Sequence, residues 1–303
     1  MNETIHKTMV LAMAFVLSGI FITFCTQSVE NQKEGEGIVN TDEILKEFQT
    51  VGLLHNKVMA EVLDDFRKHE EPLDDSEDYF AFLEESLVNN LSTKDLLQGM
   101  KREEIRALVV DELARTRNDY RVKRNKTLES GSYLQSIVSE FEGILSPQQI
   151  DILRRIENII NNSLTVEMMI ISLEMVNESP DVLALEYEDR LVIYAATSIG
   201  IESAIYWSAH FQEWVEVLMY SDPSELNFQK VAGAGFFDSV QWFSGRRMVN
   251  ADVAGGVGGA VGGCMAGSLA GGVGCLPGAL TWGLIGAAGG SVTNALLQIL
   301  DQL

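Results

Sequence analysis

The sequence predicts an all-α protein in which an amphipathic helical bundle is followed by a glycine-rich C-terminal helical hairpin. Apolar residues recur at helical spacing between residues 41 and 227, and serine-proline pairs mark helix starts. Residues Val253 to Leu300 form a run of 48 residues without a charged side chain or a histidine. The interleaved acidic and apolar positions are typical of a bundle rather than of βα units.

Amphipathic helices are expected at Thr41–Arg67, Asp75–Asn90, Thr93–Tyr120 and Tyr133–Leu145. Apolar and acidic positions are interleaved at helical spacing in all of them, so one face of each helix is suited to a core and the other to water. The first helix shows the pattern most clearly, with apolar residues at Ile44, Phe48, Val51, Leu54, Val58 and Val62.

Two serine-proline pairs indicate where later helices begin. Ser146 stands before Pro147, and Gln149 occupies the third helical position, which is the arrangement of a capping box. A second pair precedes Asp181, an acid at the end of a helix where the dipole favours negative charge. The helix that starts at this second pair is expected to run to Tyr220.

The stretch from Leu191 to Trp207 holds a single charged residue, Glu202. Two interpretations fit it: a membrane-associated or partner-binding helix, or a central helix that is apolar on all sides because other helices surround it. We favour the central helix, because charged residues flank the stretch and Glu202 interrupts it. Its aromatic residues are then expected in a core or an interface.

Small residues in the uncharged C-terminal region recur every four positions. This period favours a helix over the alternative of a strand in which valine and glycine alternate, because strands of about 20 residues are rare. Such a helix presents a surface that another helix can approach backbone to backbone. The helix-packing residues predicted from this pattern are Gly255, Gly259, Gly263, Gly267 and Gly271 in the first arm, with Gly286 and Gly290 in the second.

Proline and glycine near Pro277 divide the region into two arms, Val253 to Gly272 and Gly278 to Leu300, each near the ~20 residues that cross a bilayer. The glycines make a lone first arm unfavourable in water by roughly 8–10 kcal/mol. The hairpin therefore needs a membrane or a tightly packed protein partner. If the first arm is helical through Gly272, Cys264 and Cys275 lie ~16 Å apart along its axis. They are then not expected to form an intrachain disulfide.

The repeated G-x-x-x-G steps resemble the glycine-zipper helices of two-peptide bacteriocins, which pair inside a target membrane. The resemblance covers about 50 of the 303 residues and is compositional. This chain is longer than those peptides and is acidic, and it begins with a different export signal. The resemblance implies helix pairing in or on a membrane and leaves antimicrobial activity open.

Residues 228–252 form a predicted hinge between bundle and hairpin. Trp242 and Phe243 stand close to Arg246 and Arg247, just before the uncharged run. Aromatic and basic residues in this position are typical of a membrane-interface anchor. A hinge that packs on the bundle is the alternative.

Residues 1–24 are expected to be a signal peptide or anchor, because an uncharged run follows a short polar start. The residues that end at Cys25 resemble a bacterial lipobox, which implies cleavage and lipidation at Cys25. Phe24 departs from the small residue that this motif prefers. Ordinary cleavage near Ser28 and an uncleaved anchor remain as alternatives. Residues 25–40 are mostly polar and are predicted to be a tether. The tether leads to the predicted acidic bundle, residues 41–227, and the predicted hairpin comprises residues 253–303.

The formal net charge of −22 argues against nucleic acid as a partner, since phosphate binding needs a cationic surface. The four histidines are dispersed, and no nucleophile elbow, phosphate loop or paired-cysteine motif occurs. We therefore predict no enzyme activity, no catalytic residues, no metal and no cofactor.

Two functional hypotheses follow. The first is an exported, cell-envelope or secreted protein whose glycine-zipper hairpin associates with membrane lipid or with a second copy of itself. One version of it is a bacteriocin-like or pore-forming protein, and another is a structural or lipoprotein component. The second hypothesis is a soluble helical binding module in which the hairpin packs against the bundle, specifically against the apolar stretch from Leu191 to Trp207.

Overall fold

The described part of the chain, in a computed structural model, comprises residues 41–69, 73, 75–124, 133–219, 244–269 and 274–301. The predicted signal peptide or anchor, the predicted lipidation site Cys25, the predicted tether, Trp242, Phe243 and Gly271 lie outside these residues. The described residues form α-helices, one 3₁₀ turn and no strand, with a single isolated bridge between Glu142 and Leu145. The all-α fold class is confirmed.

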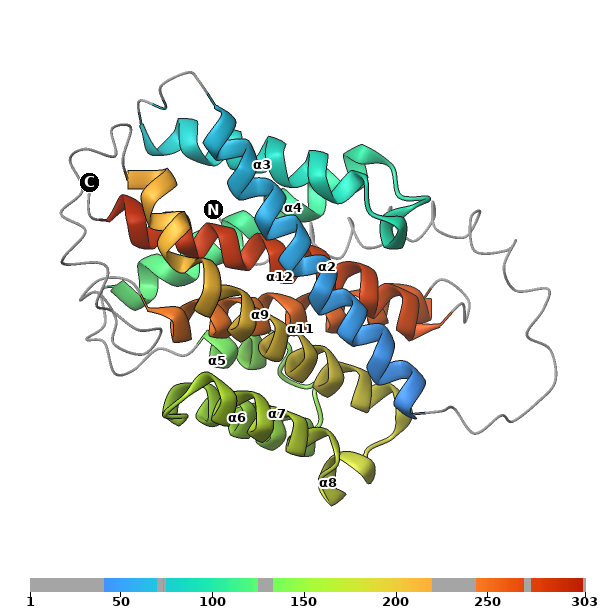
Figure 1. The fold of residues 1–303 in the computed structure, drawn as a ribbon. Helices are drawn as coiled ribbons and strands as arrows, with labels where there is room; N and C mark the ends of the chain where they lie inside the picture. Colours follow the sequence, from blue (N-terminus) through green and yellow to red (C-terminus); the bar gives the residue numbers. More distant parts are fainter. Residues whose placement is uncertain are drawn as a thin grey trace.

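Helices α3 (Ser76–Ser92) and α4 (Arg102–Arg124) lie in the upper part of Figure 1, and α2 (Thr41–Lys68) runs diagonally across the front of the molecule. The sequence predicted one helix over Thr93–Tyr120, which is wrong in its first third. A 3₁₀ turn, η2 (Asp95–Leu97), and Gly99 interrupt it. Gly99 has φ +103°, a conformation that a helix cannot contain and that glycine adopts readily.

The opposite side holds α5 (Tyr133–Glu140), α6 (Pro147–Asn162), α7 (Val166–Asn177) and the short α8 (Pro180–Leu183). The capping box at the start of α6 is confirmed: the Gln149 backbone N–H donates to Ser146 Oγ, and the Ser146 N–H donates to Gln149 Oε1. Helix α7 was not expected from the sequence. The prediction of one continuous helix from Pro180 to Tyr220 is also wrong, because α8 ends at Leu183.

The long helix α9 (Tyr187–Met219) starts afresh after this break, with Glu188 and Asp189 in its first turn. Every residue from Leu191 to Gly200 is buried, and α9 contacts α2, α6, α7, α11 and α12. The interpretation of this stretch as a central helix is confirmed. Its aromatic residues Tyr206, Trp207 and Trp214 are buried as well.

The glycine-rich region forms two helices, α11 (Gly245–Leu269) and α12 (Cys275–Leu300), which run side by side through the middle of the molecule (Figure 1). The first arm begins eight residues earlier than expected, inside the predicted hinge. Gly274, with φ +105°, stands immediately before α12. Almost all of α12 is buried, because α2, α3, α4, α9 and α11 surround it.

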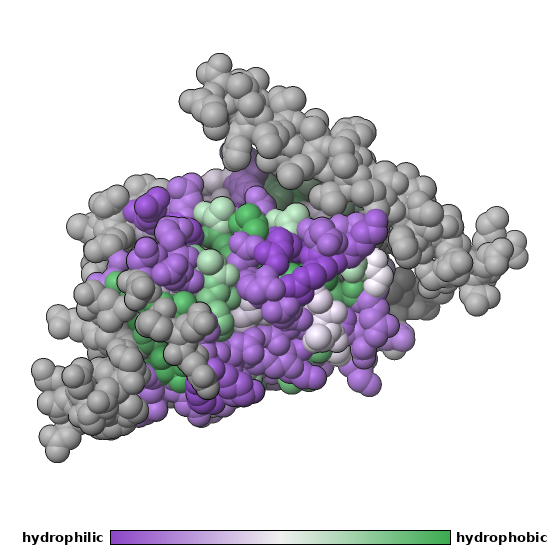
Figure 2. Space-filling view, turned by 90° about the horizontal axis from the view of Figure 1, so that it is seen from above, coloured by the Kyte–Doolittle hydropathy of each residue, from purple (hydrophilic) through white to green (hydrophobic). Residues whose placement is uncertain are grey.

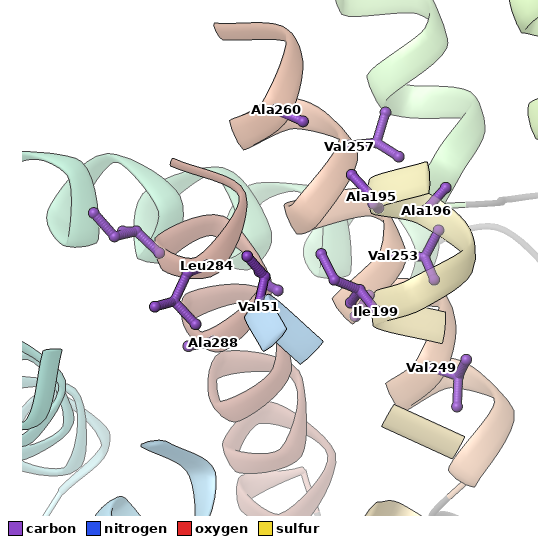
Figure 3. Close-up of a cluster of buried hydrophobic side chains, with 14 of the residues drawn as sticks. Val51, Ala195, Ala196, Ile199, Val249, Val253, Val257, Ala260, Leu284 and Ala288 are labelled. Carbon is purple, nitrogen blue, oxygen red and sulfur yellow. The ribbon is translucent and has the colours of Figure 1, made fainter. Parts of the chain in front are cut away.

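One hydrophobic core extends across all these helices. Part of it is drawn in Figure 3, with contributions from Val51 of α2, Ile199 of α9, Val253 and Val257 of α11, and Leu284 of α12. The surface is different in character: hydrophilic residues cover most of the face on the side of α3, with hydrophobic residues between them (Figure 2). The hairpin therefore forms part of the interior of the bundle and is not an appendage to it.

Candidate functional site

The two arms of the hairpin meet through a seam of glycines. A Cβ added to Gly255 would overlap the carbonyl oxygen of Gly286, and a Cβ on Gly259 would overlap that of Trp282. Gly263 and Gly278 face each other in the same way. The backbones of α11 and α12 are thus in direct contact, which only residues without a side chain permit.

The other predicted glycines in the described part of the chain, Gly267, Gly286 and Gly290, also lie along this seam. A Cβ on Gly267 would come within 2.7 Å of the Gly274 oxygen, and one on Gly290 within 2.9 Å of the Ala251 oxygen. A Cβ on Gly286 would overlap the oxygen of Gly255. The period of four places Gly255, Gly259, Gly263 and Gly267 on one side of α11, where the backbone of α12 lies against them.

The outer end of the hairpin is closed by a disulfide between Cys264 and Cys275, with the two Cα atoms 3.9 Å apart. The expectation that these cysteines do not pair is wrong. That expectation assumed that Cys264 and Cys275 are separated along a single helix axis. In the structure α11 ends at Leu269, and α12 runs back alongside it. The reversal brings Cys275 alongside Cys264.

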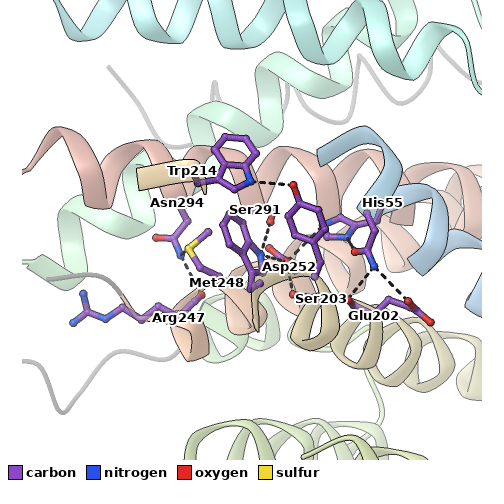
Figure 4. Close-up of polar contacts among 12 residues, drawn as sticks. His55, Glu202, Ser203, Trp214, Arg247, Met248, Asp252, Ser291 and Asn294 are labelled. Carbon is purple, nitrogen blue, oxygen red and sulfur yellow. Dashed lines mark hydrogen bonds and ion pairs between the residues drawn. The ribbon is translucent and has the colours of Figure 1, made fainter. Parts of the chain in front are cut away.

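A polar cluster lies where α11 meets α2, α9 and α12 (Figure 4). We define it as the Asp252 cluster, which consists of His55, Ser203, Trp207, Asp252 and Ser291. All five side chains are fully buried. Ser203 Oγ and Trp207 Nε1 both donate to Asp252 Oδ2, the latter at 3.1 Å, and Trp207 Nε1 also lies 3.2 Å from Ser291 Oγ. The cluster therefore connects both arms of the hairpin to the bundle.

His55 faces Asp252 from α2, with its Nε2 3.5 Å from Asp252 Oδ2. Its Nδ1 lies 3.0 Å from Asn56 Oδ1, and Asn56 Nδ2 donates to the Glu202 carbonyl oxygen at 3.0 Å. Because the Asn56 amide donates to Glu202, its oxygen accepts from Nδ1 of His55, and the neutral ring carries its proton there. His55 Nε2 and Asp252 Oδ2 are then both hydrogen-bond acceptors, and their lone pairs repel each other. A proton held between the two atoms removes this repulsion.

Burial sets the protonation of this pair. It raises the pKa of Asp252 to about 7, against hydrogen bonds from Ser203, Ser291 and Trp207 that lower it. Burial also lowers the pKa of His55 to about 4, against the bond to Asn56 that raises it. Both shifts favour the uncharged forms, as expected for groups removed from water.

A second buried polar group lies on the other side of the hairpin. Arg115 Nη2 of α4 donates to Glu112 Oε2, and Thr116 Oγ1 donates to Glu112 Oε1 at 3.1 Å. A Cβ on Gly258 would overlap the Arg115 guanidinium, and one on Gly289 would lie 2.7 Å from Glu112 Cγ. Glycines outside the seam therefore make room for this ion pair. Burial raises the pKa of Glu112, and the charge of Arg115 opposes that shift.

The predicted anchor residues Arg246 and Arg247 lie in the first turns of α11 and are half-buried. Arg246 Nη2 donates to the Ser163 carbonyl oxygen at 2.7 Å, which ties the start of α11 to the end of α6. The Arg247 carbonyl oxygen accepts from Asn294 Nδ2 at 3.1 Å. In this structure both residues contribute to packing between helices.

The Asp252 cluster contains the residue types of a serine hydrolase triad but not its arrangement. Ser203 donates to the carboxylate and not to the imidazole, so the imidazole that takes the serine proton in a triad does not face the hydroxyl. Complete burial also leaves no route for a substrate. The geometry fits a structural tie between helices. In the described residues, no group of three or more His, Cys, Asp or Glu side chains could hold a metal ion.

Sequence reasoning did not predict the Asp252 cluster, although two signals for it exist. His55 lies on the buried face of α2 between Val51 and Val58, where a polar residue needs a partner. Asp252 immediately precedes the uncharged run. Among the described helices, α12 alone is long and apolar enough to cross a membrane, and most of its apolar stretch is buried inside the protein. No family model, curated protein or solved structure matches the chain.

Proposed function

We propose that this chain is an exported, non-enzymatic envelope protein that keeps its glycine-zipper hairpin inside the bundle and uses it to associate with a membrane. In the bacteriocin-like version the hairpin forms a pore in a neighbouring membrane. In the structural version it remains in the membrane of its own cell. The observation that carries the proposal is an uncharged helical hairpin, closed on itself by a glycine seam, inside a shell of amphipathic helices.

The hairpin can leave the bundle without losing its own internal contacts. Its arms meet backbone to backbone, and this seam needs no other helix. The longer arm, α12, has 26 residues, and the hydrocarbon core of a bilayer needs about 20. Helical hydrogen bonds satisfy the backbone of both arms, which is the requirement for a segment in lipid.

Polar side chains of α12 also find partners within the hairpin. Asn294 Nδ2 donates to the Arg247 carbonyl oxygen, and Gln298 Oε1 accepts from the Ser244 N–H at 3.0 Å. Gln298 Nε2 lies 3.0 Å from the Met248 sulfur. These contacts join α12 to the start of α11, so they move with the pair of helices.

The disulfide supports the exported location. Disulfides persist in oxidising compartments and are rare in the cytosol. The Cys264–Cys275 bond links the ends of the two arms and keeps them together when the hairpin moves. Lipidation at Cys25 would add an anchor on the far side of the tether.

A reversible lock on the hairpin tests the proposal. A Cβ added to Gly200 of α9 would lie 3.1 Å from Val253 Cγ2 of α11, close to the spacing between Cβ and the opposite sulfur in a disulfide. Gly200→Cys/Val253→Cys in a Cys25→Ser background would therefore bind the hairpin to the bundle. We expect the oxidised lock to abolish dye leakage from lipid vesicles and reduction to restore it.

The two single-cysteine variants are the matched controls, because they share the reduction of the native disulfide but cannot lock. They should leak dye under both conditions. Equal leakage from the locked and reduced forms would show that the hairpin does not need to leave the bundle. Absence of leakage from every form, across zwitterionic and anionic vesicles, would refute the pore-forming version. Vesicle co-flotation of the reduced form alone would then support the structural version.

A second candidate function is a soluble binding module in which the hairpin is a permanent core. The observation that favours it is the packing of α11 against α9 and the burial of α12 by five neighbouring helices. In this case neither leakage nor co-flotation occurs in the locked or the reduced form. The lock experiment therefore separates the two candidates.

A further inference from the structure

An apolar stripe on the outer face of α7 has no partner in the described part of the chain. Leu164 is 74% exposed, Met168 49%, Ile171 56% and Met175 66%. Helical order extends from Val166 to Asn177, and Leu164 lies two residues before it. Exposed large apolar residues are common singly, but a continuous stripe of four indicates a binding surface.

The stripe follows the spacing of a coiled-coil seam. Within α7, Met168, Ile171 and Met175 are separated by three and four positions, the spacing of the a, d and a positions of a heptad, and Leu164 extends the stripe from the bend before the helix. Glu167 and Glu174 then occupy the g positions beside the seam, and both are exposed. Ser172 occupies the e position on the other side. An acidic edge therefore runs along one side of the apolar stripe.

The surface is held rigidly from behind. Met169, Leu173 and Val176 on the inner face of α7 are buried, and α7 packs against α6 and α9. The Met168 N–H donates to Thr165 Oγ1 at 3.1 Å, which caps the start of the helix. Figure 1 shows α7 at the edge of the molecule away from α3. A helix that is ordered before binding loses little conformational entropy when it binds.

We propose that this face of α7 docks a helix of another protein, with apolar residues along its seam and Lys or Arg opposite Glu167 and Glu174. Charge complementarity selects this occupant. A second copy of the chain would place glutamate against glutamate in an antiparallel pair, and glutamate against Ser172 in a parallel pair, so neither arrangement gains an ion pair. An anionic membrane surface would be repelled by the same glutamates. The proposal is independent of the hairpin and its membrane function.

Two synthetic amphipathic helices of about five turns each test this surface. Both carry leucine at the a and d positions, one with lysine and the other with glutamate beside the seam. Fluorescence anisotropy with the full chain should detect binding of the lysine peptide and not of the glutamate peptide. Ile171→Ser/Met175→Ser should weaken the lysine peptide by at least about tenfold, because both anchors are lost. Leu53→Ser, at an exposed apolar position of α2, is the matched control and should leave binding unchanged.

A charge reversal separates specific docking from attraction to an acidic protein. Glu174→Lys should reduce the affinity for the lysine peptide and increase that for the glutamate peptide. Glu103→Lys, which changes the net charge equally on the exposed surface of α4, should do neither. Circular dichroism of each variant should match the parent, because all the substituted side chains are exposed.

Three results would overturn the proposal. Equal effects of Glu174→Lys and Glu103→Lys would show attraction without a defined surface. A change of oligomeric state in Ile171→Ser/Met175→Ser by light scattering would make a second copy the occupant. Loss of vesicle co-flotation in the same variant, with peptide binding retained, would make the occupant a lipid surface.

Discussion

The His55 and Asp252 pair should give the protein opposing dependences of stability on pH, which single substitutions would uncover. Asp252 has a folded-state pKa of about 7, above its ordinary 3.8. Its contribution to stability is therefore complete below pH ~3.8 and is lost as the pH rises through ~7. His55 has a folded-state pKa of about 4, below its ordinary 6.5. Its contribution is complete above pH ~6.5 and is lost as the pH falls through ~4.

The magnitudes of the two effects are similar. One pKa unit corresponds to ~1.4 kcal/mol, so the shift of His55 is equivalent to roughly 3 kcal/mol and that of Asp252 to roughly 4 kcal/mol. Between pH ~4 and ~6.5 the unfolded chain binds a proton at His55 while the folded chain retains one at Asp252. The two slopes oppose each other, and the pair makes stability nearly independent of pH in this range.

When one partner is removed, the pH dependence of stability contributed by the other should no longer be cancelled. We expect Asp252→Asn to become less stable as the pH falls from ~6.5 to ~4, and His55→Gln to become less stable as the pH rises from ~4 to ~7, each by roughly 3 kcal/mol. Urea unfolding followed by tryptophan fluorescence at a series of pH values measures both. Trp207 and Trp214 are buried and report the transition.

The comparison uses differences from the parent at each pH, so that titration of Glu112 and other shared groups cancels. The reasoning is refuted if the difference curve of Asp252→Asn is flat or slopes in the same direction as that of His55→Gln.

Three further predictions concern the hairpin. Gly259→Ala should destabilise the fold by ~1–3 kcal/mol, because the added Cβ meets the α12 backbone. The Cβ of Gly262→Ala meets only the Trp282 ring, at 3.3 Å, so this variant should be neutral or stabilising by up to ~1 kcal/mol. Chemical denaturation compares the two, and equal effects would contradict the seam. Cys264→Ser/Cys275→Ser should lower the unfolding free energy by about 3 kcal/mol through loss of loop closure, and an unchanged midpoint would contradict it. Deletion of 253–303 should leave a chain without cooperative thermal unfolding, since α12 fills the core; a sharp transition would show that the other helices fold alone.

Truncation of the hairpin would remove part of the hydrophobic core together with the candidate membrane element. In the structure the core that includes Val51 and Ile199 is completed by Val253 and Leu284. Truncation therefore does not separate the two functional candidates, and the disulfide lock between α9 and α11 does.

Local patterns in the sequence were sufficient for the fold class, the cap at Ser146, the central helix and the spacing of the glycines. Each depends on residues within a few turns of one another, so composition and period carry the information. The missed features close to these patterns are also local in origin: α7 is short, and Gly99 and the break after Leu183 end helices that the apolar pattern alone would continue.

Only the tertiary structure decided where the hairpin lies and what it contacts. The disulfide depends on a chain reversal, which places Cys275 beside Cys264 although the helix axis would separate them. The Asp252 cluster joins residues from four helices, and the pKa values of Asp252 and His55 follow from their shared burial. An uncharged glycine-rich sequence fits lipid and a close-packed protein interior equally well, because both lack water. The choice between them in this structure came from the amphipathic helices that surround the hairpin.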